Sequence, residues 1–150
     1  MAGNLTVINA TIANNKATIG GAIFIDKFND YNYNIKFQNV VFKDNEASGE
    51  NNHAGGAIYA QAVGGQILID NCSFISNSVS KNFAGGAIHA LQLIDGIKIT
   101  NSKFINNTAN SPENYGGGAI CFIGGNTERM GKLDISDSVF EDNKDNVAGA

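Results

Sequence analysis

The sequence predicts an all-β solenoid, a right-handed three-sided parallel β-helix of about five coils with roughly 30 residues in each. Three observations predict this fold class: a Gly-Gly-Ala-Ile motif that occurs four times, a Phe-x-x-Asn motif that alternates with it, and an alternating apolar segment between the two. Because each unit needs its neighbours to bury an apolar face, we expect a single repeat domain over residues 1–150.

The Gly-Gly-Ala-Ile motif sets the repeat period, with intervals of 35, 30 and 32 residues. The glycine pairs are Gly20 and Gly21, Gly55 and Gly56, Gly85 and Gly86, and Gly117 and Gly118. Recurrence in successive units indicates a structural role, either a tight corner or a close approach of two backbones where a Cβ would clash. A phosphate-binding loop is the alternative, but no Lys-Ser or Lys-Thr follows the glycines.

The Phe-x-x-Asn motif recurs at intervals of 32, 30 and 36 residues. Its copies are Phe42 and Asn45, Phe74 and Asn77, Phe104 and Asn107, and Phe140 and Asn143, with Ile12 and Asn15 as an imperfect first copy. Stacked coils place equivalent residues above one another, so we expect an internal phenylalanine column. An amide carries both donors and an acceptor, so we also expect an asparagine ladder.

The third segment alternates apolar and polar residues, as a half-buried strand does. Its copies are Leu5–Asn9, Ile35–Asn39, Ile67–Asn71, Ile97–Asn101 and Leu133–Asp137. The closing Asn or Asp predicts a second ladder at a corner, since Asn tolerates left-handed turn geometry. We expect three short strands in each unit and no helix. Parallel crossovers are right-handed in most proteins, which predicts the sense of winding.

The alternation of Gly-Gly-Ala-Ile with Phe-x-x-Asn resembles the repeats of the chlamydial polymorphic outer membrane proteins, and related repeats occur in adhesin-like surface proteins of other microbes. The resemblance extends from Leu5 to Ala150. It implies a β-helical passenger segment of an autotransported protein, located on the cell surface or secreted. It also implies adhesion to a host-cell surface protein or glycan, with possible self-association.

The chain ends favour a segment of a longer surface protein. Met1–Asn4 has neither the basic nor the apolar stretch of a secretory signal, and Ala148–Ala150 resembles the start of another glycine corner. The alternative is a complete protomer whose open strand edges pair head to tail.

Composition argues against several classes of partner and site. The net charge is −4 with 10 Lys plus Arg, so there is no basic footprint and we expect no nucleic-acid binding. Cys72 and Cys121 belong to different motifs in different coils, which predicts two free thiols. His53 and His89 form no cluster with carboxylates at metal-ligand spacing, so we expect no metal and no cofactor.

The residue after each Gly-Gly-Ala-Ile isoleucine is the first candidate for binding. If the isoleucines point inward, alternation directs Phe24, Tyr59, His89 and Cys121 outward and predicts an exposed column. Exposed aromatic rings suit stacking against a sugar ring or an apolar partner surface. The alternatives are a reversal of inside and outside, or a column that packs beneath a loop.

Loops of variable length supply the second candidate surface, because insertions in a solenoid often carry recognition. Tyr31, Tyr33 and Arg129 are the loop residues that we expect to touch a partner. The alternative is that these polar loops are solvated connections.

An enzyme is the competing functional class, since a polysaccharide lyase or hydrolase can be built on a β-helix. Such chemistry needs grouped carboxylates, whereas Asp44 and Glu141 lie in distant coils. A purely structural spacer shares every repeat feature. We therefore expect a non-enzymatic adhesin module without catalytic residues, with the enzyme and the spacer as alternatives.

Overall fold

The computed structural model describes residues 4–28, 34–49, 53–81, 83–111, 116–124 and 131–146. Regular structure in these ranges is entirely β, and they contain no apolar helix of membrane-spanning length. The strands form four parallel sheets, which we name A to D.

Sheet A comprises β1 (Leu5–Ala13), β4 (Ile35–Lys43), β8 (Ile67–Asp70), β9 (Ser73–Ile75), β13 (Ile97–Thr100), β14 (Lys103–Ile105), β18 (Leu133–Ser136) and β19 (Val139–Glu141). Sheet B comprises β2 (Lys16–Ala17), β5 (Glu46–Ala47), β10 (Ser78–Val79), β15 (Thr108–Ala109) and β20 (Lys144–Asp145). Sheet C comprises β6 (His53–Gly55), β11 (Phe83–Gly85) and β16 (Gly116–Gly117). Sheet D comprises β3 (Ile23–Phe28), β7 (Ile58–Val63), β12 (Ile88–Leu93) and β17 (Ile120–Gly124).

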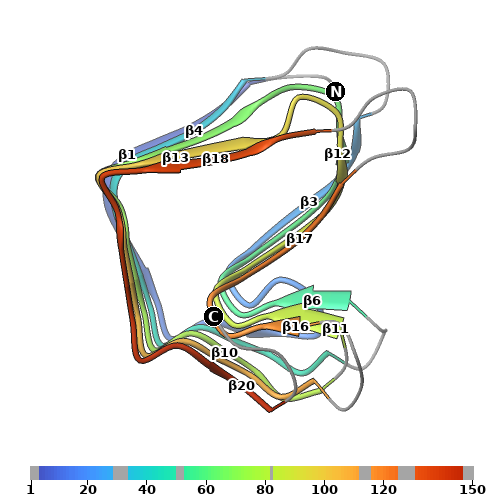
Figure 1. Ribbon diagram of the computed structural model, residues 1–150, viewed down its shortest axis with the longest axis vertical. Coiled ribbons are helices and arrows are strands. Elements are labelled where there is room, and N and C mark those ends of the chain that lie inside the picture. The colour runs from blue at the N-terminus through green and yellow to red at the C-terminus, as the bar shows by residue number, and fades with distance from the viewer. Residues whose placement is uncertain are drawn as a thin grey trace.

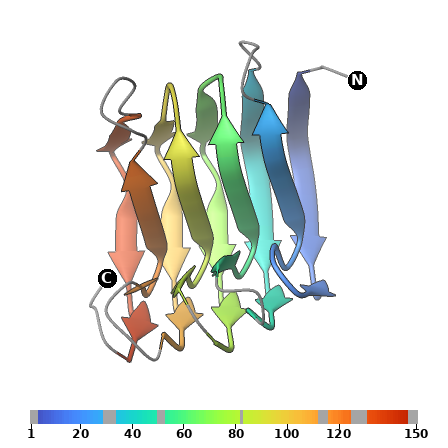
Figure 2. The ribbon, with the colours of Figure 1, turned by 90° about the vertical axis from the view of Figure 1, so that its right-hand side faces the viewer.

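The sheets stack into a parallel β-solenoid, which confirms the predicted fold class. Equivalent segments superpose in the view along the stack and lie side by side in the perpendicular view (Figures 1 and 2). Sheet D has four strands, so the described residues complete about four turns rather than the five expected. A fifth unit contributes β18, β19 and β20 to sheets A and B. The right-handed sense of the winding stays a prediction.

The cross-section has three long sides and one smaller lobe (Figure 1). The long sides are the two limbs of sheet A and sheet D, and the lobe is built by sheets B and C. The two limbs of sheet A meet at a corner of left-handed residues, as the closing Asn or Asp predicts. Their φ angles are 53° at Asn9, 55° at Asn39, 50° at Asn71, 52° at Asn101 and 50° at Asp137.

The expectation of three strands per unit was too low, because a middle unit contains five. β9 and β10 are separate strands, and β11 is a further strand that ends at Gly85, the first glycine of the pair. The additional strands enclose a second, smaller core of alanine and valine inside the lobe. Its members are Ala47, Ala54, Val79, Ala84 and Ala109. Single small apolar residues between polar ones carry too weak a periodic signal to mark these short strands.

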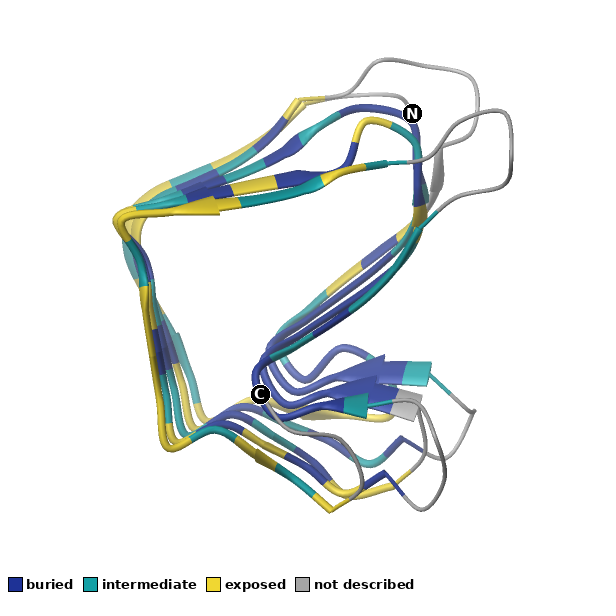
Figure 3. Ribbon diagram, in the orientation of Figure 1, coloured by how far each residue is buried: buried dark blue, intermediate teal, exposed yellow. Residues whose placement is uncertain are grey.

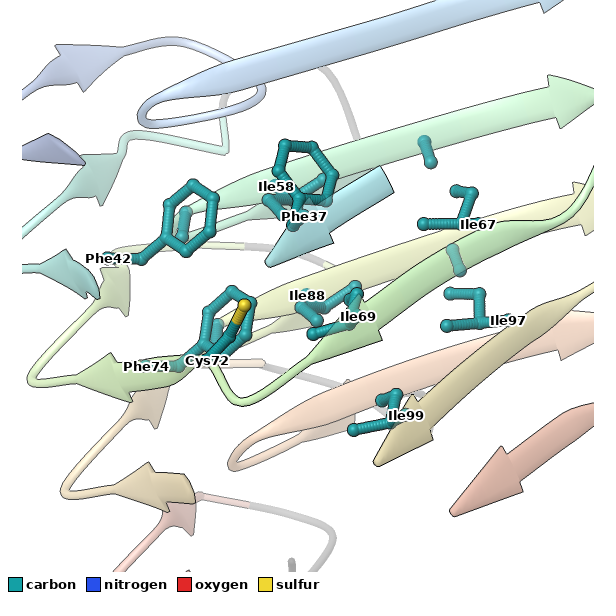
Figure 4. Packing of buried hydrophobic residues seen from close by; sticks show 14 of the residues in the cluster. Phe37, Phe42, Ile58, Ile67, Ile69, Cys72, Phe74, Ile88, Ile97 and Ile99 are labelled. Carbon is teal, nitrogen blue, oxygen red and sulfur yellow. The ribbon is translucent and has the colours of Figure 1, made fainter. Parts of the chain in front are cut away.

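The main core lies between sheet A and sheet D, where columns of phenylalanine and isoleucine stack from coil to coil (Figure 4). Ring centroids are 4.8 Å apart for Phe42 and Phe74, 4.6 Å for Phe74 and Phe104, and 4.7 Å for Phe104 and Phe140. The planes are nearly parallel, with angles of 3° to 6°. The predicted phenylalanine column is therefore confirmed. Burial is deepest in the middle coils and lower in the outermost ones (Figure 3).

The asparagine ladder of the Phe-x-x-Asn motif is also confirmed. Asn45, Asn77 and Asn107 are fully buried. Each side-chain oxygen accepts hydrogen bonds from the backbone N–H and the Nδ2 of the Asn one coil earlier, as Asn77 Oδ1 does from Asn45 at 3.1 and 2.9 Å. Each Nδ2 also donates to a main-chain carbonyl of the preceding coil, as Asn77 does to Phe42 at 3.0 Å.

The ladder at the sheet A corner is shorter and lies at the surface. Asn39 Nδ2 donates to Asn9 Oδ1 at 2.8 Å, and Asn71 Nδ2 donates to Asn39 Oδ1 at 2.8 Å. Asn101 instead donates to Asp70 Oδ1 at 3.0 Å. The predicted column is present, but its side-chain bonds change partner at the fourth residue.

At the glycine pairs, backbone segments approach one another closely. This is one of the two roles that the sequence predicted for them. A Cβ on Gly55 would overlap the carbonyl oxygen of Ile58, and one on Gly56 would overlap the carbonyl oxygen of Gly86 in the next coil. The same two contacts recur at Gly85 and Gly86. Space rather than backbone dihedral angle therefore excludes a side chain from these positions.

Candidate binding surface

Phe24, Tyr59, His89 and Cys121 form one column on sheet D, with each residue directly beside the next in the strand register. The rings of Phe24 and Tyr59 stack at 5.4 Å with an interplanar angle of 18°. Tyr59 and His89 follow at 5.4 Å and 46°. Because Ile58 and Ile88 belong to the main core and Tyr59 and His89 do not, the column faces away from that core as predicted.

The predicted exposure of this column was wrong for three of its four members. Phe24 is 49% exposed, but Tyr59 is 3%, His89 is 0% and Cys121 is 8% exposed. Sheet C turns back against the outer face of sheet D and covers them, with the His53 ring centroid 5.1 Å from that of His89. In the first coil, a single bridge between Gly20 and Gly55 stands where later coils have a sheet C strand, which leaves Phe24 open.

Burial governs the electrostatics of the covered residues. Desolvation, with a smaller effect of His53, lowers the pKa of His89 to about 3. Desolvation, with Asp26 as a smaller cause, raises the pKa of Tyr59 to about 12. Desolvation, followed by Asp145, raises the pKa of Cys121 to about 11. All three side chains are thus held in their neutral forms at pH 7.

Tyr59 is fixed beneath the exposed ring of Phe24. Its hydroxyl donates a hydrogen bond of 2.8 Å to Gln61 Oε1, two residues along β7. The buried Tyr59 ring is therefore held at one end by this bond and on one face by Phe24. The result is an exposed aromatic ring on a rigid support.

The other predicted contact residues Tyr31, Tyr33 and Arg129 lie outside the described residues. The structure therefore neither joins them to Phe24 nor separates them from it.

The acidic side chains of the described residues are distributed over the solenoid rather than gathered. Within the described ranges, no three His, Cys, Asp or Glu residues are grouped so as to hold a metal ion. Asp70 shows what a typical acid does here: its Oδ1 accepts hydrogen bonds from Thr100 at 2.7 Å and from Asn101 at 3.0 Å. These bonds lower the pKa of Asp70, so this carboxylate acts as a link between coils. Cys72 and Cys121 are free thiols, as predicted.

His53 was not among the predicted binding residues. His53 lies on β6, pairs in register with Phe83 and packs against His89. The signal was present, because His53, Phe83 and Tyr115 each stand two residues before a Gly-Gly pair. A ring-bearing residue at one offset in three units is a recurrence that a search for repeats can find.

Comparison with known protein families gives two matches, over residues 39–61 and 101–123, to the Chlamydia polymorphic membrane protein repeat. Each matched segment contains one Phe-x-x-Asn and one Gly-Gly-Ala-Ile motif, the two motifs on which the predicted resemblance rests. Neither a curated protein nor a solved structure matched the chain. Two segments of the chain therefore match the Chlamydia polymorphic membrane protein repeat, and they lie two coils apart in the parallel β-solenoid.

Proposed function

We propose that this solenoid is a non-enzymatic adhesin module on a cell surface that binds a host-cell or envelope partner through the Phe24 end of the sheet D column. The repeat match supports a surface-protein module, because the matched family is one of membrane proteins. The partner in this proposal is a surface protein or a glycan.

The observation that carries the proposal is the ring of Phe24, which is 49% exposed yet stacked on the buried ring of Tyr59. An aromatic side chain that is already ordered loses little conformational freedom when a partner docks. Its free face offers a flat apolar surface to the C–H face of a sugar or to a partner side chain. Tyr31, Tyr33 and Arg129, which lie outside the described residues, are further contact residues proposed from the sequence alone.

The test is retention of the purified chain on immobilised glycans and host-surface proteins, with release of sugar ends scored in the same wells. Phe24→Ala should weaken retention about tenfold, as expected for loss of one aromatic contact. Val139→Ala is the matched control, since Val139 is 48% exposed at the opposite end of the solenoid. Equal retention of both variants and the parent would discard the Phe24 contact. The triple variant Tyr31→Ala, Tyr33→Ala, Arg129→Ala tests the loops in the same way.

The same assay distinguishes the adhesin from the two competing functions, the enzyme and the spacer. Release of sugar ends would favour a polysaccharide-acting enzyme over an adhesin. Neither retention nor release would favour a structural spacer.

Head-to-tail self-association is a second candidate function, and apolar side chains on the outermost coils favour it. Leu5 on β1 is 36% exposed and Ile135 on β18 is 43% exposed, although both continue columns that are buried in the middle coils. β1 at one end of the stack, and β18 and β19 at the other, are also the edge strands of sheet A, with main-chain groups that another parallel strand can pair.

Sedimentation velocity over a range of concentrations tests this assembly. Ile135→Lys should weaken association, because Ile135 continues the buried column of Ile69 and Ile99 and a charge there would be buried at the contact between copies. Val139→Lys is the control, since Val139 continues the outward column of Ser73 and the exposed Lys103. A parent chain that stays monomeric at every concentration would rule out the assembly.

A further inference from the structure

Two histidines meet in the joint where sheet C covers sheet D. His53 on β6 and His89 on β12 have ring centroids 5.1 Å apart at an interplanar angle of 60°. The backbones are in close contact here, since a Cβ on Gly55 would lie 2.8 Å from the backbone nitrogen of His89. His89 is fully buried, and neither of its ring nitrogens has a hydrogen-bond partner among the described residues.

The surroundings of His89 suit a neutral ring and not a charged one. The titratable neighbours are His53 on β6, Tyr59 on β7 and Cys121 on β17. Asp26 on β3 acts on Tyr59, and Asp145 on β20 acts on Cys121. Ala84 and Gly85 of β11 carry no charge. Among the described residues, the charged group identified as acting on His89 is therefore His53, which repels a second proton.

The lobe and the main body have separate cores of very different size. The lobe is held by Ala47, Ala54, Val79, Ala84 and Ala109. The main core includes the phenylalanine column and the stacked isoleucines. Since hydrophobic stabilisation scales with the apolar area buried, the lobe is the less stable unit and can separate while the main core persists.

We propose that the joint between sheets C and D is an acid-sensitive switch, in which protonation of His89 and His53 detaches the lobe and uncovers the column of Tyr59, His89 and Cys121. The switch is independent of the adhesin proposal and can hold or fail without it. The trigger is mild acidity, and the ligand is the proton.

The direction of the response follows from linkage. An exposed histidine takes up a proton below about pH 6.5, whereas burial lowers the pKa of His89 to about 3 and also lowers the pKa of His53. The closed joint is therefore stable above pH 6.5 and loses stability as the pH falls, because the open form binds more protons. For His89 alone, the opening equilibrium rises about tenfold at pH 5.5 and about a hundredfold at pH 4.5, relative to pH 7.5.

The two cysteine thiols allow the proposal to be tested by chemical labelling of the unmodified sequence. Cys121 lies beside His89 in sheet D, on the side that the lobe covers, whereas Cys72 belongs to the main core and is 1% exposed. Each thiol is labelled with 4,4′-dithiodipyridine, which reacts in acid, and the labelled cysteine is identified by mass spectrometry. Rates are divided by those of the denatured chain at the same pH. Protection of Cys121 should fall about tenfold from pH 7.5 to 5.5 while that of Cys72 is unchanged.

His89→Phe should weaken the acid response of Cys121, because the ring remains while one of the two proton-binding sites, the fully buried one, is gone. Tyr59→Phe is the matched control in the same column and should retain the acid response. Unchanged protection of Cys121 in the parent chain down to pH 4.5 would overturn the switch. Simultaneous loss of protection at Cys72 and Cys121 would also overturn it, since that marks global unfolding. These parent-chain measurements decide the question even if His89→Phe does not fold.

Discussion

Asn77 donates two hydrogen bonds to one oxygen, since its backbone N–H and its Nδ2 both reach Oδ1 of Asn107 at 3.0 Å. The same amide donates to the carbonyl of Phe42 and accepts two bonds from Asn45. One side chain thus joins three coils. Because all of these groups are buried, each depends on this residue for a partner that water cannot replace.

Asn77→Ala should therefore lower the free energy of unfolding by about 3–5 kcal/mol, because it leaves several buried donors and an acceptor without partners. Urea unfolding measures this change. The control is Asn39→Gly, which removes the bonds of an exposed ladder residue and accepts the φ of 55°. It should cost about 1 kcal/mol or less. Equal losses for the two variants would contradict a special role for the buried ladder.

The phenylalanine column should show a dependence on position. Phe74→Ala removes a fully buried ring with stacking partners on both faces, which should cost about 3–5 kcal/mol. Phe140→Ala removes the 37% exposed end of the column, with Phe104 as its stacking partner, and should cost about half as much or less. Urea midpoints of both variants against the parent give the comparison. A larger loss at Phe140 would show that the coil ends, and not the middle, limit stability.

The glycines offer a test of close backbone packing. Gly85→Ala would place a Cβ over the carbonyl oxygen of Ile88 and 2.8 Å from the backbone nitrogen of Cys121, so it should destabilise by about 3 kcal/mol or prevent folding. Gly124→Ala is the control, because a Cβ there meets nothing within 4 Å. That change should be neutral or stabilise by up to about 1 kcal/mol. Thermal unfolding of the two variants tests this difference in stability, and equal melting temperatures would refute the packing argument.

The solenoid and its ladders could be predicted from sequence because stacking repeats the same physical environment in every coil. Phe74 and Asn77 recur at one offset because the space inside a middle coil admits a ring and an amide at those two positions. The direction in which Ile58 and Tyr59 point also followed from alternation along a strand.

The burial of Tyr59 and His89 could not be predicted in the same way. Alternation tells which face of a strand a residue occupies, but not whether another sheet covers that face. The covering sheet is formed by strands of two or three residues, such as β6 and β16, which lack enough alternating positions to show a period. The turn count was overestimated for a related reason, since five copies of the sheet A segment enclose about four complete turns.

Because the thiol of Cys121 is buried, we expect the folded chain to lose stability at alkaline pH. Burial raises its pKa from 9.0 to about 11, so the folded chain keeps the neutral thiol while the unfolded chain ionises above about pH 9. Its contribution is thus fully present below pH 9 and is lost as the pH rises towards 11. At pH 10 the free energy of unfolding is lower by about 1.4 kcal/mol, because the thiol is mostly ionised in the unfolded chain and mostly neutral in the folded one.

Urea unfolding at pH 8 and pH 10 measures this loss before Tyr59, with a pKa of about 12, contributes fully. Cys121→Ala should remove the Cys121 share of the decrease. Cys72→Ala is the control in the main core; burial also raises the pKa of Cys72, so this variant should remove a separate share and leave that of Cys121. If Cys121→Ala loses as much stability as the parent between the two pH values, the thiol is not shielded, and sheet C does not cover sheet D at this position.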